Sequence, residues 1–227
     1  MLRRQALAEL LGTAFLVMAV VGSGIAAQRL SPGDTGLQLL ENAAATAAAL
    51  VAIILMFGPV SGAHLNPVVT LAARVSGALT TAEAGVYMAA QVVGGLAGVI
   101  VANLMYSLPA VELSTTSRSS GGLWLGEVVA TFGLVLLVGS LVRTGRTSVA
   151  PWAVAAYIGG AYFVTSSTSF ANPAVTLARA LTDTFAGIAW RSVPAFVLAQ
   201  LVGAVLAVVV HRAFAVVPET SKEEIHV

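Results

Sequence analysis

The chain has 227 residues, of which 58% are hydrophobic and 9% are charged, and its mean hydropathy is +0.92. An average soluble domain is about one quarter charged, so this composition predicts an integral membrane protein. The absence of cysteine excludes disulfide scaffolds, iron–sulfur clusters and thiolate zinc sites. The net charge of +1, with no block of basic residues, argues against nucleic acid as a partner.

Six long apolar runs follow one another along the chain, and each is close to the ~20 residues that span a bilayer as a helix. With 22 glycines and few aromatic residues, close helix packing is favoured over a β-barrel with aromatic girdles. The sequence therefore predicts an all-α integral membrane protein with six transmembrane helices. The runs are 7–27, 43–60, 84–108, 123–142, 149–168 and 193–217.

Two further segments, 61–74 and 169–181, are too short to cross a bilayer, and each contains an Asn-Pro pair. Asn is a favoured helix N-cap and Pro is tolerated at the first helical position. About ten helical residues extend ~15 Å, half of a ~30 Å hydrocarbon core. We therefore predict two re-entrant half-helices that begin at Asn66-Pro67 and Asn172-Pro173 and meet tip to tip as one composite span.

The two halves of the chain carry the same landmarks in the same order. Glu9 and Glu127 lie in similar six-residue stretches, the Asn-Pro pairs follow, and Gln91 and Gln200 lie in matching Ala-Gln-x-Val-Gly segments. Because each half has three full spans, the second half must be inverted in the membrane relative to the first. We expect a single channel domain over 1–227, with inverted repeats at about 1–113 and 120–217 and a cytoplasmic tail at 218–227.

The basic residues indicate the orientation. If the N-terminus is cytoplasmic, seven of the eleven Lys and Arg residues lie on the cytoplasmic side. The positive-inside rule therefore favours a multi-pass protein of the cell (inner) membrane with both termini in the cytoplasm.

Half-helices that begin in the middle of a membrane predict a pore, because irregular backbone at that depth is tolerated only inside protein or along a watery cavity. Their N-termini are partly positive and would repel cations. The amides of Asn66 and Asn172 are donors, and the residues before them offer carbonyl acceptors. A lone Asn-Pro pair would indicate only the start of a surface helix, but two pairs in equivalent places favour a path for small neutral hydroxylated solutes.

The segments His64-Leu65-Asn66-Pro67-Val68 and Asn172-Pro173-Ala174, with Glu9, Gln91, Glu127 and Gln200 around them, resemble the aquaporin (major intrinsic protein) family. The resemblance covers nearly the whole chain. It implies passive flux, two Asn-Pro tips that meet in the middle of the pore, and a homotetramer in which each protomer has its own pore. The first motif differs slightly from the family pattern, with Val68 in place of Ala.

The same resemblance implies a second, narrower constriction on the outer side of the membrane, built from four positions. Counting from the two motifs without gaps places them at Thr46, Gly160, Ser169 and Val175. The aromatic, His and Arg side chains of water-selective members are then all absent, which predicts a wide filter with few hydrogen-bond donors.

A filter with Val in place of Arg is similar to that of bacterial aquaglyceroporins associated with arsenic resistance. We therefore expect arsenous acid (arsenite) and methylated arsenicals to pass, together with glycerol and water. A water or glycerol facilitator without a metalloid role is the simpler alternative. The two residues that often mark glycerol channels, an Asp and then a Lys or Arg, are here Thr176 and Ala180.

Glu9 and Glu127 allow a rival interpretation, because charged residues inside spans are costly and often functional. As a proton relay they would make the protein an ion-coupled secondary transporter. Since the two are equivalent in the repeat, we favour a structural role in which each accepts hydrogen bonds from the loop before its half-helix. We expect Gln91 and Gln200 to pack and hydrogen-bond between helices.

The remaining polar residues do not indicate a metal site or a catalytic site. His64 has no second His or carboxylate near it in sequence, so we expect a structural hydrogen bond rather than a metal site. Arg179 lies one helical turn beyond Val175, where it is a candidate to restore positive charge near the filter and to pair with Asp183. No catalytic set or phosphate-binding loop is present, so we expect neither an enzyme nor a cofactor.

Overall fold

Eight α-helices make up the part of the chain that the computed structural model describes, residues 1–214. No strand occurs within these residues. The predicted tail, 218–227, and the end of the sixth apolar run, 215–217, lie outside them. The helices are α1 (Leu2–Leu30), α2 (Thr35–Ser61), α3 (Pro67–Val75), α4 (Thr81–Met105), α5 (Gly121–Arg143), α6 (Ala150–Val164), α7 (Pro173–Arg179) and α8 (Val193–Ala213), with 3-10 turns η1 (Thr147–Val149) before α6 and η2 (Trp190–Ser192) before α8.

The predicted fold class is confirmed, because each of the six apolar runs coincides with a long helix and each Asn-Pro pair begins a short one. Five of the helices are long and apolar enough to cross a membrane on their own. The exception is α6, whose 15 residues extend roughly 22 Å. The predicted run 149–168 was too long because its last residues leave the helix at Thr165 and enter the loop before α7.

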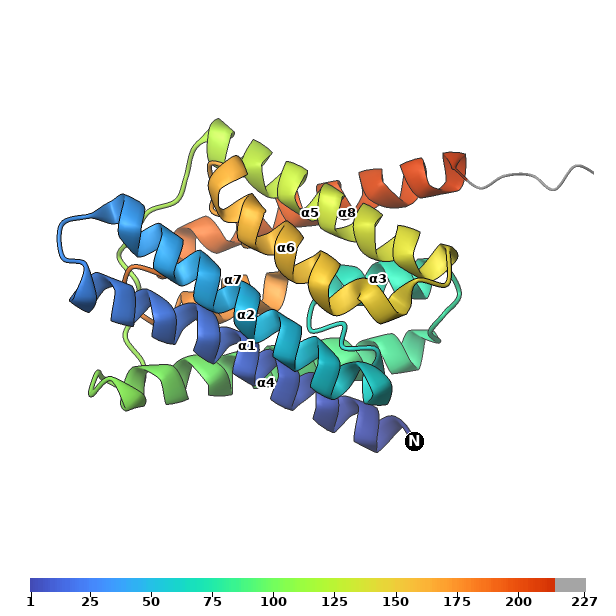
Figure 1. The fold of residues 1–227 in the computed structure, drawn as a ribbon, viewed down its shortest axis with the longest axis horizontal. Coiled ribbons are helices and arrows are strands. Elements are labelled where there is room, and N and C mark those ends of the chain that lie inside the picture. Colours follow the sequence, from blue (N-terminus) through green and yellow to red (C-terminus); the bar gives the residue numbers. More distant parts are fainter. Residues whose placement is uncertain (215–227) are drawn as a thin grey trace, which may run out of the picture.

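The two short helices lie between two groups of long ones. In Figure 1, α3 and α7 lie between the group formed by α1, α2 and α4 and the group formed by α5, α6 and α8. Within the groups α1 packs on α2 and α4, and α5 packs on α6 and α8, while α2 and α6 join the groups to each other. The order of elements in the second half thus repeats the order in the first.

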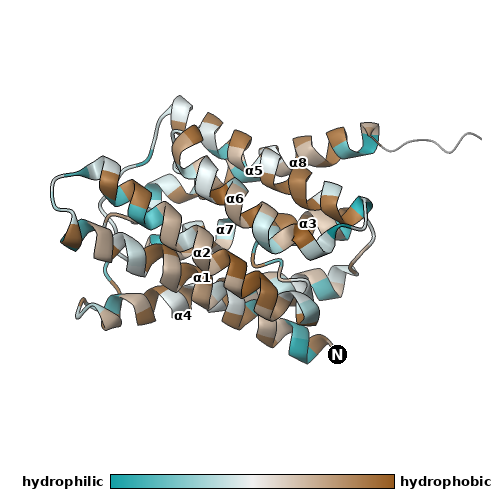
Figure 2. Ribbon diagram, in the orientation of Figure 1, coloured by the Kyte–Doolittle hydropathy of each residue, from teal (hydrophilic) through white to brown (hydrophobic). Residues whose placement is uncertain are grey.

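The outer surface of the long helices is apolar. Figure 2 shows hydrophobic residues along the central lengths of these helices and hydrophilic residues at their ends and in the loops. Large side chains such as Phe15, Leu125 and Leu198 are exposed on this surface. A surface of this kind is compatible with lipid but not with water, so the chain is a membrane protein.

Glycines bring paired helices into backbone contact. A Cβ atom on Gly94 of α4 would lie 2.1 Å from the carbonyl oxygen of Leu10 in α1, and one on Gly98 would lie 2.4 Å from that of Ala14. In the second half, a Cβ atom on Gly203 of α8 would lie 2.4 Å from a carbonyl oxygen of α5. Small residues at such crossings give membrane helices the close packing that stabilises them.

We expect Gly94→Ala to destabilise the protein, because the new methyl group would meet backbone that cannot move aside without separating α1 from α4. Overpacking of this kind costs roughly 1–3 kcal/mol, so the melting temperature in detergent should fall. Gly85→Ala, on the same helix, is the matched control, because Gly85 is exposed and has nothing within 4 Å of the added carbon. Equal melting temperatures for the two variants would contradict the assigned contact.

Candidate functional site

The two Asn-Pro pairs start the short helices in the same way. Asn66 is the N-cap of α3, and its side-chain oxygen accepts a hydrogen bond from Val68 N at 3.1 Å. Asn172 is the N-cap of α7, and its side-chain oxygen accepts from Ala174 N at 3.0 Å and Val175 N at 3.3 Å. In both helices the Pro occupies the first turn, where its missing N–H is not needed.

The structure brings the two tips together and joins them by reciprocal hydrogen bonds. Asn66 Nδ2 donates to the carbonyl oxygen of Ala171 at 2.7 Å, and Asn172 Nδ2 donates to that of Leu65 at 2.7 Å. Each amide group is therefore held by its own helix through its oxygen and by the opposite loop through its nitrogen. One N–H of each amide is not used by these bonds and can be offered to a solute. The motif residues placed at this junction, all of them buried, are Asn66, Pro67, Val68, Asn172, Pro173 and Ala174.

The loops that lead to the tips have the same unusual backbone. Ala63 and Leu65 have φ angles of 47° and 53°, and the equivalent residues Ser169 and Ala171 have 51° and 47°. None of the four is glycine, so each adopts a left-handed conformation that an L-residue rarely takes. Such a conformation persists only where surrounding contacts hold it in place.

Glu9 supplies those contacts for the first loop. It is fully buried, and it accepts from two consecutive backbone N–H groups of the loop as well as from two side chains. One of those side chains, Gln91, also donates to Thr70 Oγ1 of α3 at 2.9 Å. The four donors to Glu9 are Ser61 Oγ (2.6 Å), His64 N (2.9 Å), Leu65 N (2.7 Å) and Gln91 Nε2 (2.7 Å).

Glu127 does the same for the second loop and is equally buried. It accepts from Phe170 N at 2.8 Å, from Ala171 N at 2.9 Å and from Gln200 Nε2 at 2.5 Å. Gln200 Nε2 also donates to Thr176 Oγ1 of α7 at 2.9 Å. The two carboxylates thus occupy equivalent places and fasten equivalent loops, as the structural interpretation of these residues requires.

His64 lies in the loop before α3 and contacts two neighbouring side chains. Its Nδ1 is 3.2 Å from Thr70 Oγ1, and its ring packs edge-on against Tyr87 with the ring centres 5.3 Å apart. Within residues 1–214, no group of three His, Asp or Glu side chains is arranged to hold a metal ion.

A cavity of about 610 Å³ runs along the tips and takes its walls from both halves of the chain. The tips and the loop before α3 supply polar lining, with Asn66, Asn172 and residues 62–65. The long helices α2, α5 and α6 supply apolar lining that includes Leu50, Ile54, Leu134, Val138 and Ile158. A solute in this cavity meets amide groups and loop backbone on one side and hydrocarbon on the other.

Three of the four expected filter residues, Thr46, Ser169 and Val175, line this cavity, but Gly160 does not. Gly160 is exposed on the outside of α6, so its assignment to the filter was wrong. The residues of α6 that line the cavity include Ile158 and Tyr162, four apart and on one face of the helix. Gly160, two residues from each, lies on the opposite face.

Tyr162 stands where a small residue was expected. It is buried, and its hydroxyl oxygen is 3.2 Å from Thr46 Oγ1 across the cavity wall. An aromatic residue with a hydroxyl in a run of apolar residues was the available signal in the sequence, but an ungapped count passed over it. The cavity is therefore narrower and more polar beside Tyr162 than a small residue would make it.

A second cavity of about 530 Å³ lies beyond the first, and its lining includes Asn42, Thr116, Arg118 and Asp183. Arg179 lines both cavities. The expected pair between Arg179 and Asp183 does not form, because Asp183 instead accepts from Thr115 N at 2.9 Å and from Thr115 Oγ1 at 3.1 Å. Arg118, a single basic residue in a Ser- and Thr-rich loop, was not anticipated as part of the site.

Comparison with known proteins points to one family. Residues 1–169 match the model of the family described as major intrinsic protein. Aquaglyceroporin AqpS of Rhizobium meliloti is 48% identical over 211 residues, which is 93% of this chain and 90% of the relative. The probable aquaporin TIP-type alpha of Phaseolus vulgaris is 32% identical over 226 residues, 95% of this chain and 86% of the relative.

The fold has a solved counterpart. The X-ray structure of the aquaglyceroporin from Plasmodium falciparum superposes with a TM-score of 0.68, at 22% sequence identity, over 94% of this chain and 95% of the other. At this identity the likeness concerns the fold alone.

We expect Glu127→Gln to destabilise the protein. A carboxamide has one oxygen instead of two and adds an N–H, so at least one of the donors from Phe170, Ala171 and Gln200 loses its acceptor. A buried unsatisfied donor costs about 1–3 kcal/mol, which thermal unfolding in detergent would register. Glu112→Gln is the control, because Glu112 is an exposed loop residue whose side chain makes no hydrogen bond within residues 1–214. An unchanged melting temperature with a lost pH dependence of transport would instead support the proton-relay interpretation.

Proposed function

This chain belongs to the major intrinsic protein family, and from that premise we propose that it forms a passive transmembrane pore for small uncharged solutes, including water and glycerol. The observation that carries the proposal is the pair of crossed Asn tips at the wall of a cavity built from both halves. Amide donors on one side and hydrocarbon on the other suit a molecule that has hydroxyl groups and an apolar face.

The finer proposal is that metalloid hydroxides pass, namely arsenous acid and methylated arsenicals. Arsenous acid is uncharged near neutral pH and resembles glycerol in size and hydroxyl pattern, and a methylated arsenical adds a methyl group that the apolar wall can contact. Val175 supports this, because it places a short apolar side chain at the position where an Arg would otherwise occupy part of the opening. The side chain of Tyr162 narrows the cavity, which counts against the passage of solutes larger than glycerol. A water or glycerol facilitator without a metalloid role is therefore the alternative that flux measurements must test.

An ion-coupled secondary transporter is the alternative from another class. It would need an intramembrane charge that is free to exchange a proton or bind an ion. Glu9 and Glu127 each accept hydrogen bonds from two backbone N–H groups and from a Gln. Carboxylates held in this way are not free to exchange a proton or bind an ion, which favours a channel. The flux through a channel would rise nearly linearly with the solute gradient and would be independent of Na⁺ and of a proton gradient.

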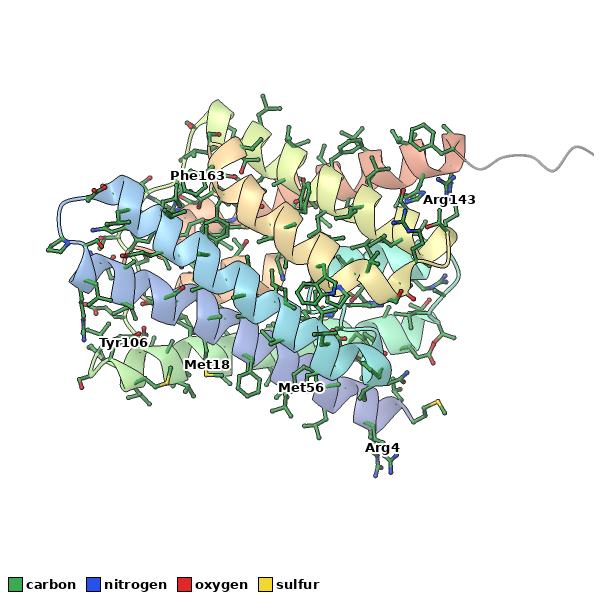
Figure 3. All side chains as sticks on the ribbon, viewed as in Figure 1. Arg4, Met18, Met56, Tyr106, Arg143 and Phe163 are labelled. Carbon is green, nitrogen blue, oxygen red and sulfur yellow. The ribbon has the colours of Figure 1, made fainter. Side chains whose placement is uncertain are left out.

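We also propose the arrangement in the membrane that the sequence suggests: one channel domain with inverted repeats at about 1–113 and 120–217, in the inner membrane, with both termini in the cytoplasm. Figure 3 shows Arg4 and Arg143 at the same end of the molecule and Tyr106 and Phe163 at the other. A shared basic end supports this orientation. A homotetramer with one pore per protomer is implied by the family, and chemical crosslinking in native membranes tests it.

The first experiment is light scattering on proteoliposomes exposed to gradients of water, glycerol and arsenous acid. We expect flux of all three above that of protein-free vesicles, with arsenous acid and glycerol close to each other in rate. Fast water flux with both solutes excluded would assign a water channel and would remove the metalloid proposal.

Val175→Arg should narrow the opening, because the added guanidinium would project into the cavity that Val175 now lines. We expect glycerol and arsenous acid to slow about tenfold, which corresponds to a barrier increase of about 1.4 kcal/mol, while water slows much less. The same stopped-flow measurement on Val175→Ala, which shortens the side chain, should show no slowing. Equal losses for water and for the larger solutes would contradict the placement of Val175 in the filter.

A further inference from the structure

Arg179 lies at the junction of the two cavities. It ends α7 one helical turn beyond Val175, on the same face of the helix. Of residues 1–214, it alone lines both the inner cavity of about 610 Å³ and the outer one of about 530 Å³. The side chain of Arg179 therefore forms part of the wall of both cavities.

The guanidinium group of Arg179 is held in place at this junction. Its Cζ atom lies 3.4 Å from the centre of the Phe170 ring, and its Nε donates to the carbonyl oxygen of Ala186. Its two terminal nitrogens make no hydrogen bond with any residue in 1–214, although the side chain is only 3% exposed.

A second arginine lies beside the first. Arg118 Cζ is 5.2 Å from the centre of the same Phe170 ring, and its guanidinium donates to the carbonyl oxygens of Gly187 at 2.9 Å and Phe185 at 3.3 Å. Three consecutive carbonyl groups, at residues 185–187, thus hold both guanidinium groups against one aromatic ring.

No carboxylate of residues 1–214 forms an ion pair with either of these two charges. Within residues 1–214 neither arginine has an acidic oxygen within hydrogen-bond distance. Asp183, which lines the outer cavity, is turned to Thr115, and the buried Glu127 is occupied by the loop before α7. The carbonyl dipoles and the one buried carboxylate nearby, Glu127, offset two full positive charges only in part, so the junction keeps a positive potential.

We propose that Arg179 supplies the fixed positive charge that excludes cations and protons at the outer constriction, with Arg118 reinforcing it from the loop before α5. The width of the opening and the positive charge beside it are then determined by different residues of α7. Val175 leaves room for solutes larger than water, and Arg179, held along the wall by Phe170 and Ala186, repels cations without filling the opening. This inference rests on the proposed function, since it requires that the two cavities form one path for solutes.

Two substitutions at the same position separate charge from structure. Arg179→Gln removes the charge and keeps a donor for the Ala186 carbonyl, whereas Arg179→Lys keeps the charge and loses the planar fork. In proteoliposomes with a potassium diffusion potential set by valinomycin, an internal pH dye measures proton entry, and light scattering on the same vesicles measures glycerol flux. Arg191→Gln is the control, because Arg191 is exposed and lines neither cavity.

We expect Arg179→Gln to raise proton entry about tenfold over the wild type, because a nearby unit charge in a partly dry site shifts the barrier for a cation by more than RT. Arg179→Lys and Arg191→Gln should remain close to the wild type, and glycerol flux should persist in all three. Arg118→Gln should give a smaller increase in proton entry, which provides a second measurement if Arg179→Gln does not fold.

The proposal is overturned if Arg179→Gln conducts glycerol but admits no more protons than the wild type, or if the Gln and Lys variants leak equally. Equal leakage would mean that Arg179 acts through packing rather than charge. A wild-type protein that conducts neither water nor glycerol above empty vesicles would instead overturn the proposed function, so the two failures are distinguishable.

Discussion

Two buried carboxylates hold the chain in a conformation that it would otherwise leave. Ala63, Leu65, Ser169 and Ala171 have left-handed backbone angles without being glycine, and each such residue costs on the order of 1–3 kcal/mol. Glu9 and Glu127 offset this cost by accepting the N–H groups of consecutive loop residues, which have no other hydrogen-bond partner within residues 1–214. The positions of the Asn tips and of the polar wall of the cavity follow from loops held in this way.

The same constraint divides the pore lining into two kinds of surface. The polar side is formed largely by short loops and helix starts, whose geometry the two glutamates and their glutamine partners determine. The apolar side is formed by residues of the long helices α2, α5 and α6, which include Leu50, Leu134 and Ile158. Solute recognition therefore depends on a few buried hydrogen bonds, and the width of the path depends on how closely the long helices approach.

Local patterns in the sequence were sufficient for the helices, the half-helix starts and the repeated Glu and Gln positions, because each depends on neighbours close in sequence or on an equivalent copy in the other half. Gly160 shows where such reasoning fails. Its place was counted from Asn172 through an irregular loop, and a count carries no information about which face of α6 turns inward; the structure turns Tyr162 inward instead. Arg118 was also missed, since only tertiary contacts bring its loop to Phe170.

The crossed amide bonds have an evolutionary consequence. Asn66 is completed by a carbonyl group of the second half, and Asn172 by one of the first, so neither half can satisfy its own tip. With the inverted repeats that we propose, a half-length ancestor could have built this junction only by pairing with a second copy inserted in the opposite direction. Such a gene product would have had to enter the membrane in both orientations, and fusion of two copies would then have freed each end to specialise. His64 on one side and Phe170 with its two arginines on the other are the kind of divergence that fusion permits.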